Sequence, residues 1–369
     1  MEKVSVGFIG SGGIAKAHVY ALKALPFYYE SLPQVELASV CSTRAESREA
    51  FAQRYSFEGA EDLESFARNP HINTVYILGP NKVHYEHLQV ALGMPQVDKI
   101  YLEKPVCGSH EEEKALVELL GSIPDTKTIQ IGFQYLQISS IREALKFWKT
   151  GVLGKALHFD LKYYHGDYLQ QTYRDKRRTR LTPAPDGGAM ADLGSHGISL
   201  LCAFLGENLQ IQSAFQAGNF EDVPEDSDLF SSLSLYEPES GAVGHMSASR
   251  ISSGTGDMIT FELYGEKGTL KFSTHEADYF EYYLEESGEW SKKIVSSRYE
   301  PISSFPSKHV PAGWLRSMVH AHYMFLTGNR TDSFLPDLSH GLAVQRLVRE
   351  NADHLKEFRR LSNNSKMSS

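Results

Sequence analysis

The sequence predicts an α/β protein with two domains, a doubly wound parallel sheet followed by an α+β domain with a large, mostly antiparallel sheet. The chain has 369 residues, which fits two domains of about 100–200 residues each. Strand-like and helix-like segments alternate up to about residue 134, which is typical of a parallel sheet with helices on both faces. Beyond that point apolar and polar residues alternate with a period of two, which is typical of antiparallel strands.

The first half contains five short apolar runs that are typical of buried strands. They cover residues 4–10, 35–42, 72–79, 99–105 and 128–134. Segments with the spacing of a helix follow the first four runs, at residues 14–25, 44–55, 84–93 and 110–122. This order predicts parallel strands joined by crossover helices.

A predicted helix at residues 138–150 leads into the second half. The strands expected there cover residues 156–165, 208–218, 228–237, 242–251, 258–265, 269–274 and 278–286, and helices at 312–326 and 338–360 close the domain. Residues 263–272 have the pattern of a hairpin. We therefore divide the chain into domains at 1–127 and 128–362, with a flexible tail at 363–369.

Composition and charge exclude several classes of protein. The net charge of −9 argues against a broad surface for nucleic acid or anionic membranes, and no apolar run approaches the ~20 residues of a membrane span. Cys41, Cys107 and Cys202 are scattered, so we expect buried free thiols rather than disulfides or a zinc site. Because the first residues do not resemble a secretory signal, the expected compartment is the cytoplasm.

One basic run, YRDKRRTR at residues 173–180, stands alone in this acidic chain. Its simplest interpretation is a solvated loop. The alternative is a loop that meets an anionic or sugar substrate.

The glycine-rich stretch after the first predicted strand fits the pattern G-x-G-x-x-G/A. In that pattern the first glycine permits a tight turn, the second lets the backbone approach a pyrophosphate, and the small third residue lets the helix pack on the strand. The stretch lies between a strand and a helix, which is the context that supports dinucleotide binding. The candidate cofactor residues of this turn are Gly10, Gly12, Gly13, Ile14 and Ala15.

The end of the second predicted strand indicates which dinucleotide is bound. Proteins that bind NAD usually carry Asp or Glu there, which holds the ribose 2′-hydroxyl. This chain has Ser42, Thr43 and Arg44 instead, two hydroxyls and a guanidinium that suit a 2′-phosphate. The pattern favours NADP(H), with NAD(H) as the alternative, in which Arg44 is only the exposed start of a helix.

Two further groups of residues have the character of a catalytic site. Lys104 lies just past the fourth predicted strand, at the sheet edge where such folds bind ligands. Asp192 and His196 are four residues apart, which places them about 40° apart on one helix face. A carboxylate beside an imidazole can fix its tautomer and raise its basicity. Such a pair is often a surface pair, and as a metal site it lacks a third ligand with fitting spacing.

Three longer segments show a resemblance to a known family. They are ILGPNKVH at 77–84, YLEKPV at 101–106 and GGAMADLGSHGISLLCAFLG at 187–206. In this order, and with the glycine turn before them, they resemble the glucose–fructose oxidoreductase / inositol dehydrogenase / MocA family over nearly the whole chain. The resemblance implies a Rossmann domain joined to a domain with an open antiparallel sheet, which often mediates homo-oligomers, here a homodimer or homotetramer.

The resemblance also implies roles for individual residues. Lys104 matches the family's active-site lysine, and Asp192 and His196 match its acid/base pair. Glu103 matches the residue beside the nicotinamide and ribose. The loop beside the cofactor matches Pro80, Asn81 and His84.

The implied activity is an NAD(P)-dependent oxidoreductase that acts on a sugar, a polyol or a related cyclic compound. A hydride passes between the nicotinamide and a secondary alcohol or ketone, while His196 takes the hydroxyl proton and Lys104 stabilises the alkoxide charge. One alternative is a glycosidase or lyase that oxidises its sugar transiently and reduces it back. A further alternative is a regulator that binds NADP without catalysis.

The sequence departs from the family pattern at two places. Gln134 and Tyr135 stand where the family often has Asn or Met followed by Arg, which removes a usual positive contact to the substrate. Gly79 stands where Thr or Ser is common. The candidate substrate contacts are Tyr135, His165, Tyr168, Arg180, His309 and Trp314.

Overall fold

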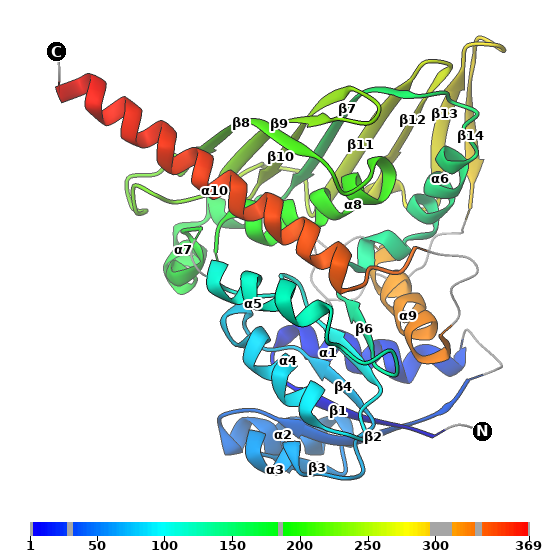
Figure 1. Cartoon of the computed structure of the whole chain (residues 1–369), viewed down its shortest axis with the longest axis vertical. Helices are drawn as coiled ribbons and strands as arrows, with labels where there is room; N and C mark the ends of the chain where they lie inside the picture. The colour runs from blue at the N-terminus through cyan, green and yellow to red at the C-terminus, as the bar shows by residue number, and fades with distance from the viewer. Residues whose placement is uncertain (1–2, 28–31, 184–186, 296–311, 329–333, 368–369) are drawn as a thin grey trace. The chain divides into compact units, whose positions relative to one another are not determined.

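The computed structural model describes residues 3–27, 32–183, 187–295, 312–328 and 334–367, of which 312–315 and 356–367 are described by their backbone alone. The chain forms two compact units (Figure 1). The first unit comprises Met1–Gln137 and Trp314–Leu342, and the second comprises Ile138–Gly313 and Ala343–Ser369.

The first unit is built on a six-stranded parallel sheet. Its strands are β1 (Lys3–Ile9), β2 (Gln34–Cys41), β3 (Gly59–Glu61), β4 (Thr74–Ile77), β5 (Lys99–Leu102) and β6 (Thr128–Ile131). Their order, β3-β2-β1-β4-β5-β6, is that of a Rossmann fold, in which the strand order reverses between β1 and β4. Six of the seven residues of β1 are buried, as expected for a central strand covered on both faces. The predicted parallel sheet is confirmed.

Helices connect these strands. They are α1 (Gly13–Ala24), α2 (Ala45–Tyr55), α3 (Leu63–Ala67), α4 (His84–Gly93) and α5 (His110–Leu120), with short 3₁₀ turns η1 (Leu25–Phe27), η2 (Asn81–Val83) and η3 (Gln134–Gln137). At the start of α5, the Ser109 hydroxyl accepts a hydrogen bond from the amide of Glu112, whose carboxylate accepts the Ser109 amide. This capping box explains why acidic residues begin the helix. The sequence predicted these helices but not β3 and α3.

The helix α9 (Ala312–Thr327) packs on the Rossmann sheet although it follows it by almost two hundred residues. Its Phe325 meets the rings of Tyr76 on β4 and Tyr101 on β5 edge-on, at 5.8 and 5.7 Å between centroids. The amide of Gln130 on β6 donates to the Ala321 carbonyl. The predicted segmentation needs correction here, because β6 and most of α9 belong to the first unit, where tertiary packing rather than chain order places them.

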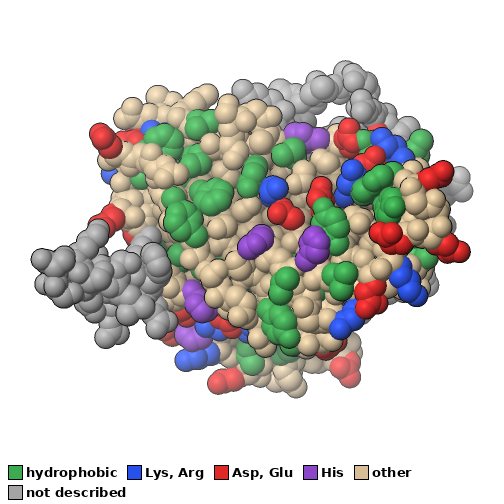
Figure 2. Space-filling model, turned by 90° about the horizontal axis from the view of Figure 1, so that it is seen from above, with side chains coloured by type: hydrophobic (Ala, Val, Ile, Leu, Met, Phe, Trp, Pro, Cys, Tyr) green, Lys and Arg blue, Asp and Glu red, His purple; other side chains and the backbone are tan. Residues whose placement is uncertain are grey.

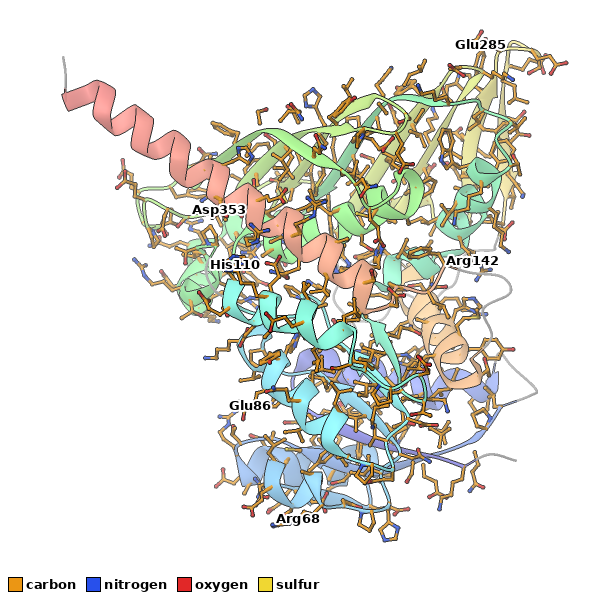
Figure 3. The ribbon with its side chains drawn as sticks, in the orientation of Figure 1. Arg68, Glu86, His110, Arg142, Glu285 and Asp353 are labelled. Atoms are coloured by element: carbon orange, nitrogen blue, oxygen red, sulfur yellow. The ribbon has the colours of Figure 1, made fainter. Side chains whose placement is uncertain are left out.

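The second unit is built on an eight-stranded sheet. Its strands are β7 (Ala156–Tyr164), β8 (Gln210–Ala217), β9 (Phe230–Glu237), β10 (Ala242–Ser249), β11 (Met258–Gly265), β12 (Gly268–Ser273), β13 (Tyr279–Leu284) and β14 (Glu289–Ile294). The order is β14-β13-β12-β11-β7-β10-β9-β8. All neighbours are antiparallel except β7 and β10. The mostly antiparallel sheet is confirmed, and β14, which pairs with β13 beyond the turn carrying Glu285 (Figure 3), was not predicted.

Two helices cover one face of this sheet, α6 (Ser139–Lys149) and α8 (Ser195–Leu205). A Cβ atom at Gly197 would lie 2.7 Å from both Leu161 and Met246, so α8 sits close against β7 and β10. At the other end of α8, Phe204 packs on Phe261 with 5.0 Å between ring centroids, and its carbonyl accepts the Trp148 indole N–H. This helix carries one of the predicted catalytic residues.

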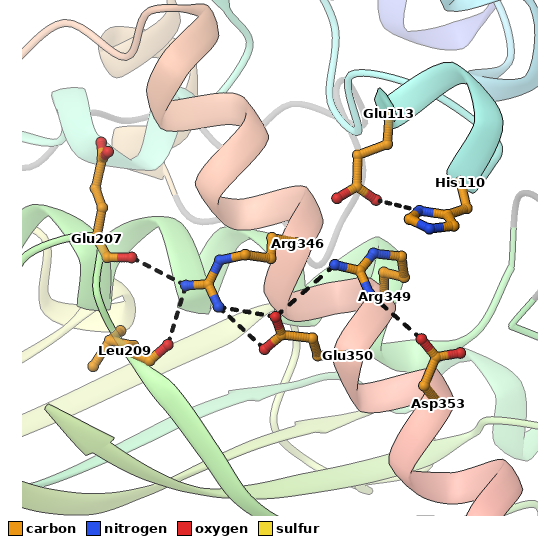
Figure 4. A network of polar contacts seen from close by, with 8 residues as sticks. All are labelled: His110, Glu113, Glu207, Leu209, Arg346, Arg349, Glu350 and Asp353. Atoms are coloured by element: carbon orange, nitrogen blue, oxygen red, sulfur yellow. Dashed lines mark hydrogen bonds and ion pairs between the residues drawn. The ribbon is translucent and has the colours of Figure 1, made fainter. Parts of the chain in front are cut away.

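The last helix, α10 (Leu338–Met367), begins in the first unit and continues in the second. It runs through most of the predicted flexible tail, so residues 363–367 are helical. Figure 4 shows how the helix is tied to the second unit: Arg346 bonds the Glu350 carboxylate and donates to the carbonyls of Glu207 and Leu209, both at 3.1 Å. These carbonyls follow α8, so α10 braces the helix that bears the candidate site.

Candidate functional site

The glycine turn leaves β1 in a conformation that requires glycine. Gly10 has a φ of 126°, and a Cβ atom there would lie 2.7 Å from the carbonyl carbon of Leu78. Its amide donates to the Cys41 carbonyl at 2.8 Å. The turn is therefore held between the ends of β2 and β4, at the point where the strand order reverses.

The N-terminus of α1 behind this turn suits a pyrophosphate. Gly12 is the N-cap, no side chain caps the helix, and its first turn has no acidic residue. A Cβ atom at Gly12 or Gly13 would meet nothing within 4 Å, so the backbone there is open to a ligand. Ala15 is completely buried and lets the helix lie close to the sheet, while Ile14 is half-buried. Amide N–H groups at a helix start, without a side-chain partner, are natural phosphate ligands.

The loop after β2 carries two arginines. Thr43 and Arg44 are exposed, and Arg44 is the N-cap of α2. Arg48, one turn further, donates from Nη1 to the Ser42 carbonyl at 3.0 Å and braces the loop. Sequence reasoning missed Arg48, although its spacing of four residues from Arg44 was the available signal.

Two carboxylates at the end of β3 accept hydrogen bonds from other residues. Glu61, at the end of β3, accepts hydrogen bonds from Ser39 and Asn69. Asp62 caps α3 by accepting from the Ser65 amide at 2.8 Å, which lowers the pKa of Asp62.

The loop after β4 is tied to the loop after β5 by a buried histidine. His84 is completely buried, with Nδ1 at 2.6 Å from the Pro105 carbonyl and Nε2 at 2.8 Å from the Gly79 carbonyl. Pro80 is exposed and is the N-cap of η2, which begins at Asn81. His84 thus contributes to the predicted cofactor loop by holding its shape.

The departure at Gly79 has a local explanation. A Cβ atom there would lie 3.2 Å from Val83 and 3.4 Å from the His87 ring, so this ring takes the space beside residue 79. Burial lowers the pKa of His87 to about 4, with the neighbouring His84 adding to the effect. No sequence pattern indicated where the His87 ring would lie.

The loop after β5 holds the Glu-Lys-Pro motif. Glu103 is 5% exposed, and its Oε2 accepts the Lys104 amide at 3.2 Å while its Oε1 lies 3.0 Å from His18 Nε2. Lys104 is half-buried, and its peptide bond to Pro105 is cis. His18 in turn lies 2.9 Å from His322 on α9. Sequence reasoning did not connect these two histidines with Glu103.

In the second unit, Asp192 and His196 do not share one regular α-helix. Residues Met190–Gly194 form a π-helical turn and α8 begins at Ser195, so the angle derived for an α-helix does not apply. His196 is 5% exposed. π-Helical turns recur at functional sites because they alter side-chain direction locally.

Both oxygens of the Asp192 carboxylate meet guanidinium groups. Oδ2 lies 2.7 Å from Arg250 and Oδ1 lies 3.2 Å from Arg180. Arg250 is completely buried, donates to the Arg180 carbonyl at 2.7 Å and lies over the Tyr168 ring at 4.6 Å. The sequence prediction paired Asp192 with His196 and missed this arginine, which ends the predicted strand 242–251.

Tyr163 links the surroundings of His196 to a further acidic residue, Asp257. The Tyr163 ring is 6.1 Å from the His196 ring, and its hydroxyl donates to the Asp257 carboxylate at 3.3 Å. Burial raises the pKa of Asp257 to about 7, and the charges of Asp167 and Asp192 add to this effect. Nothing in the sequence pattern singled out Asp257, which lies in the loop between β10 and β11.

The predicted substrate contacts are distributed over both units. Tyr135 is buried in the first unit, within η3. In the second unit His165 is buried, with its Nδ1 accepting the Asp167 amide, and Tyr168 packs in an apolar cluster around Leu181 and Leu229. Tyr168 therefore belongs to a core rather than to an open surface.

The three remaining candidate substrate contacts are Arg180, Trp314 and His309. Arg180 is engaged with Asp192, as described above. Trp314 lies on α9, with its side chain outside the described part of the structure, and His309 lies outside the described residues.

The basic run at 173–180 is largely exposed to solvent, as predicted, but it is helical rather than a loop. It forms the short helix α7 (Gln171–Lys176) and a 3₁₀ turn at Arg178–Arg180. Arg174 is 5% exposed, forms a two-pronged ion pair with Asp222 at 2.9 Å for each bond, and lies 3.9 Å from the centre of the Phe220 ring. This arginine is structural, because it is neutralised and enclosed within the second unit.

Three further properties bear on the class of protein. Cys41, Cys107 and Cys202 are buried free thiols. Within the described ranges no three His, Cys, Asp or Glu side chains gather as a metal ion would require. Among the described helices none combines the length and apolar character needed to cross a membrane.

The strand order, the glycine turn with its uncapped helix and the polar loops after β4 and β5 define a Rossmann-type dinucleotide-binding protein with a second, sheet-based unit. Residues 4–126 match the model of an oxidoreductase family with an NAD-binding Rossmann fold. Residues 141–271 match the GFO/IDH/MocA C-terminal domain. The chain therefore belongs to the GFO/IDH/MocA family of oxidoreductases, whose members include named dehydrogenases, and the predicted resemblance is confirmed.

Curated relatives and solved structures agree with this membership. Levoglucosan dehydrogenase of Pseudarthrobacter phenanthrenivorans is 27% identical over 306 residues, 75% of each chain. The scyllo-inositol 2-dehydrogenase (NAD(+)) of Bacillus subtilis is 26% identical over 69% of this chain and 73% of its own. The structure of levoglucosan dehydrogenase with NADH and levoglucosan has a TM-score of 0.79 at 22% identity, covering 96% of this chain and 98% of that one. At 22% identity, the similarity to this solved structure shows a shared fold alone.

Proposed function

We propose that the protein is a dehydrogenase that moves a hydride between NADP(H) and a secondary alcohol of a sugar, polyol or related cyclic compound. The observation that carries the proposal is the α1 N-terminus, which no side chain caps and which lies where the strand order reverses between β1 and β4. Glu103 and Lys104 directly follow β5, the strand beside β4. The relatives named for levoglucosan and scyllo-inositol support the substrate class.

Lys104, Asp192 and His196 are assigned the reaction. The bound nicotinamide supplies the hydride acceptor and donor at its C4 atom. His196 takes the hydroxyl proton, since an imidazole nitrogen can act as a general base. Lys104 donates a hydrogen bond to the same oxygen and stabilises its developing negative charge. Asp192, held by Arg180 and Arg250, orients the substrate or the imidazole from a fixed position.

Turnover with a panel of sugars and polyols, followed by nicotinamide absorbance, tests this assignment. The Lys104→Ala and His196→Ala variants should bind NADP with unchanged affinity and lose turnover by roughly a hundredfold or more. If the two residues serve one step, the double variant should lose little more than either single variant. Full activity in both single variants would remove the assignment. Product formed without net nicotinamide change would instead favour the redox-recycling alternative.

The preference for NADP is tested at the loop after β2. Arg44 and Arg48 supply positive charge there, and Glu61 and Asp62 are occupied elsewhere. The wild type should bind NADPH more tightly than NADH, and Arg44→Ala should weaken NADPH about tenfold with little effect on NADH. Ala45 lies beside Arg44 at the start of α2, so Ala45→Ser serves as a matched exposed control. A wild type that prefers NADH would contradict this part of the proposal.

The outer face of the second unit's sheet is the proposed contact between copies in a homodimer or homotetramer. Phe215 and Val243 are more than half exposed on it, and Trp290 is 52% exposed beside Lys271. The space-filling view from above shows hydrophobic side chains interspersed with charged and histidine side chains (Figure 2). Phe215→Asp and Val243→Asp should lower the mass measured by light scattering.

A further inference from the structure

Three buried titratable side chains of the first unit form a chain of contacts. His18 on α1 lies 3.0 Å from Glu103 through Nε2, and 2.9 Å from His322 on α9 through Nδ1. Both histidines are completely buried and Glu103 is 5% exposed. Burial of three such groups is costly unless they satisfy one another, so the chain calls for an explanation beyond packing.

The carboxylate of Glu103 is fixed at both oxygens. Oε2 accepts the Lys104 amide at 3.2 Å, and Oε1 faces His18. A Cβ atom at residue 132 would lie 2.8 Å from this carboxylate, so Gly132 provides the space in which it sits. A carboxylate only accepts hydrogen bonds, so His18 carries its proton on Nε2.

His322 keeps the His18 ring in this orientation. The two rings stack with 4.9 Å between centroids and 17° between planes. Tyr76 and Tyr101 meet both rings edge-on at 5.1 to 5.6 Å. Burial lowers the pKa of His322 well below its ordinary value, with His18 adding to the effect, so this ring is neutral at neutral pH.

The chain ends at a functional edge of the sheet. In a Rossmann fold the dinucleotide lies across the carboxyl ends of the strands, with one half on each side of the order reversal. The loop after β2 serves the adenosine half, and the loops after β4 and β5 lie on the other side. Glu103 follows β5 directly and precedes Lys104, so its carboxylate and the Lys104 main chain belong to the nicotinamide half.

We propose that His18 is a positioning residue which, backed by His322, fixes Glu103 and the Lys104 main chain for binding the nicotinamide half of the cofactor. This inference rests on the proposed function. It assigns a role to a residue inside the first helix, where the glycine pattern alone suggests only packing. The contact through Glu103 is the means by which a buried ring reaches the cofactor.

Variants of His18 separate positioning from packing. His18→Gln places an amide donor near the position of Nε2 and keeps the bond to Glu103. His18→Asn is too short to reach Glu103, and its amide lies near the position of Nδ1, toward His322. The two variants are equally polar and differ mainly in which partner they reach. Glu103→Gln removes the charge at the end of the chain.

Two ligands distinguish binding at the nicotinamide half of the cofactor site from binding at the adenosine half. Binding is measured by calorimetry for NADPH and for 2′-phospho-ADP-ribose, which lacks the nicotinamide. His18→Asn and Glu103→Gln should weaken NADPH roughly tenfold and leave 2′-phospho-ADP-ribose within about twofold, since the lost hydrogen bond involves a charged group. His18→Gln should stay within about threefold of wild type for both ligands.

A buried histidine outside the chain provides the control. His340 is 1% exposed at the start of α10 and packs edge-on against Phe133, so His340→Asn should leave the ratio of the two dissociation constants unchanged. Equal weakening of both ligands by His18→Asn, or equal behaviour of the Gln and Asn variants, would overturn the positioning role. A wild type that binds neither ligand would overturn the proposed function itself and this inference with it.

Discussion

The two units hold a candidate-site carboxylate in different ways. In the first unit an imidazole and a backbone amide hold Glu103. In the second unit two guanidinium groups hold Asp192, those of Arg180 and Arg250, and Arg250 is completely buried. A guanidinium keeps its charge at every accessible pH. The arginine clamp therefore pairs Asp192 with two permanent charges, whereas the histidine chain holds Glu103 through hydrogen bonds.

The largest effect on the free energy of unfolding is expected when the buried arginine Arg250 is replaced. Arg250→Met removes the 2.7 Å partner of the Asp192 carboxylate but leaves its 3.2 Å contact with Arg180, so it should lower the free energy of unfolding by about 2–3 kcal/mol. Arg180→Met removes the other partner of the same carboxylate, but the Arg180 side chain is 39% exposed, so the loss should stay below about 1 kcal/mol. Urea denaturation measures both.

Equal losses in these two variants would show that burial does not distinguish the two arginines. The double variant Arg250→Met/Asp192→Asn should recover part of the stability, because the side chain that lost its buried partner is then uncharged.

Replacing Asp257 should have a smaller effect on the free energy of unfolding, and this effect should depend on pH. The carboxyl has a pKa of about 7 when folded, raised mainly by burial from an ordinary value of 3.8. The folded state therefore binds the proton more tightly, and stability falls as pH rises from about 4 to about 7. Asp257→Asn keeps an acceptor for Tyr163 and tolerates the local φ of 50°.

The variant should be more stable than wild type by about 2 kcal/mol at about pH 8, and it should lose most of the slope between pH 4 and 7. Denaturation curves across this range give the result. A variant whose stability keeps the wild-type slope would show that Asp257 does not titrate in this window.

The smallest effect on the free energy of unfolding is expected at His322. Here stability rises with pH, whereas the contribution of Asp257 falls with pH. Its folded pKa lies well below 6.5, so the unfolded state binds protons that the buried ring cannot. Stability from this group is present above pH 6.5 and is lost as pH falls below it. His322→Gln should cost about 1 kcal/mol at about pH 8 and flatten the stability curve below 6.5.

His87 also contributes to the pH dependence of stability and therefore remains in the His322→Gln curve. Burial also lowers its pKa, to about 4, so it contributes a slope of the same sign. The His322→Gln curve should therefore be flatter than wild type but not level. A curve as steep as wild type would mean that His322 already takes a proton in the folded protein.

Much of the first unit could be predicted from the sequence because its signals are local. The glycine turn is explained by the positive φ of Gly10 and the open space at Gly12. The Glu-Lys-Pro motif after β5 was located by a short apolar run ending at proline. The partners of these residues could not be predicted, since His322 is 304 residues from His18 and no spacing rule connects them.

The second unit was harder to predict at the level of the site. The period-two runs gave the strands of the sheet, but the parallel pairing of β7 with β10 depends on contacts between distant segments. The regular helix assumed for Asp192 and His196 is interrupted by a π-helical turn. Arg250 looked like the polar end of a strand, and only the packing of Tyr168 and Asp192 around it shows why it is buried.

The sequence by itself therefore determined the class of the two sheets and the dinucleotide turn, and it singled out Glu103, Lys104, Asp192 and His196 as candidates, because each depends on periodicity or on a short motif. The tertiary structure alone decided that α9 joins the Rossmann unit and which groups pair with the carboxylates of Glu103 and Asp192. The physical reason is that a buried charge selects its partner by proximity in space, and that proximity is created by the packing of segments far apart in the chain.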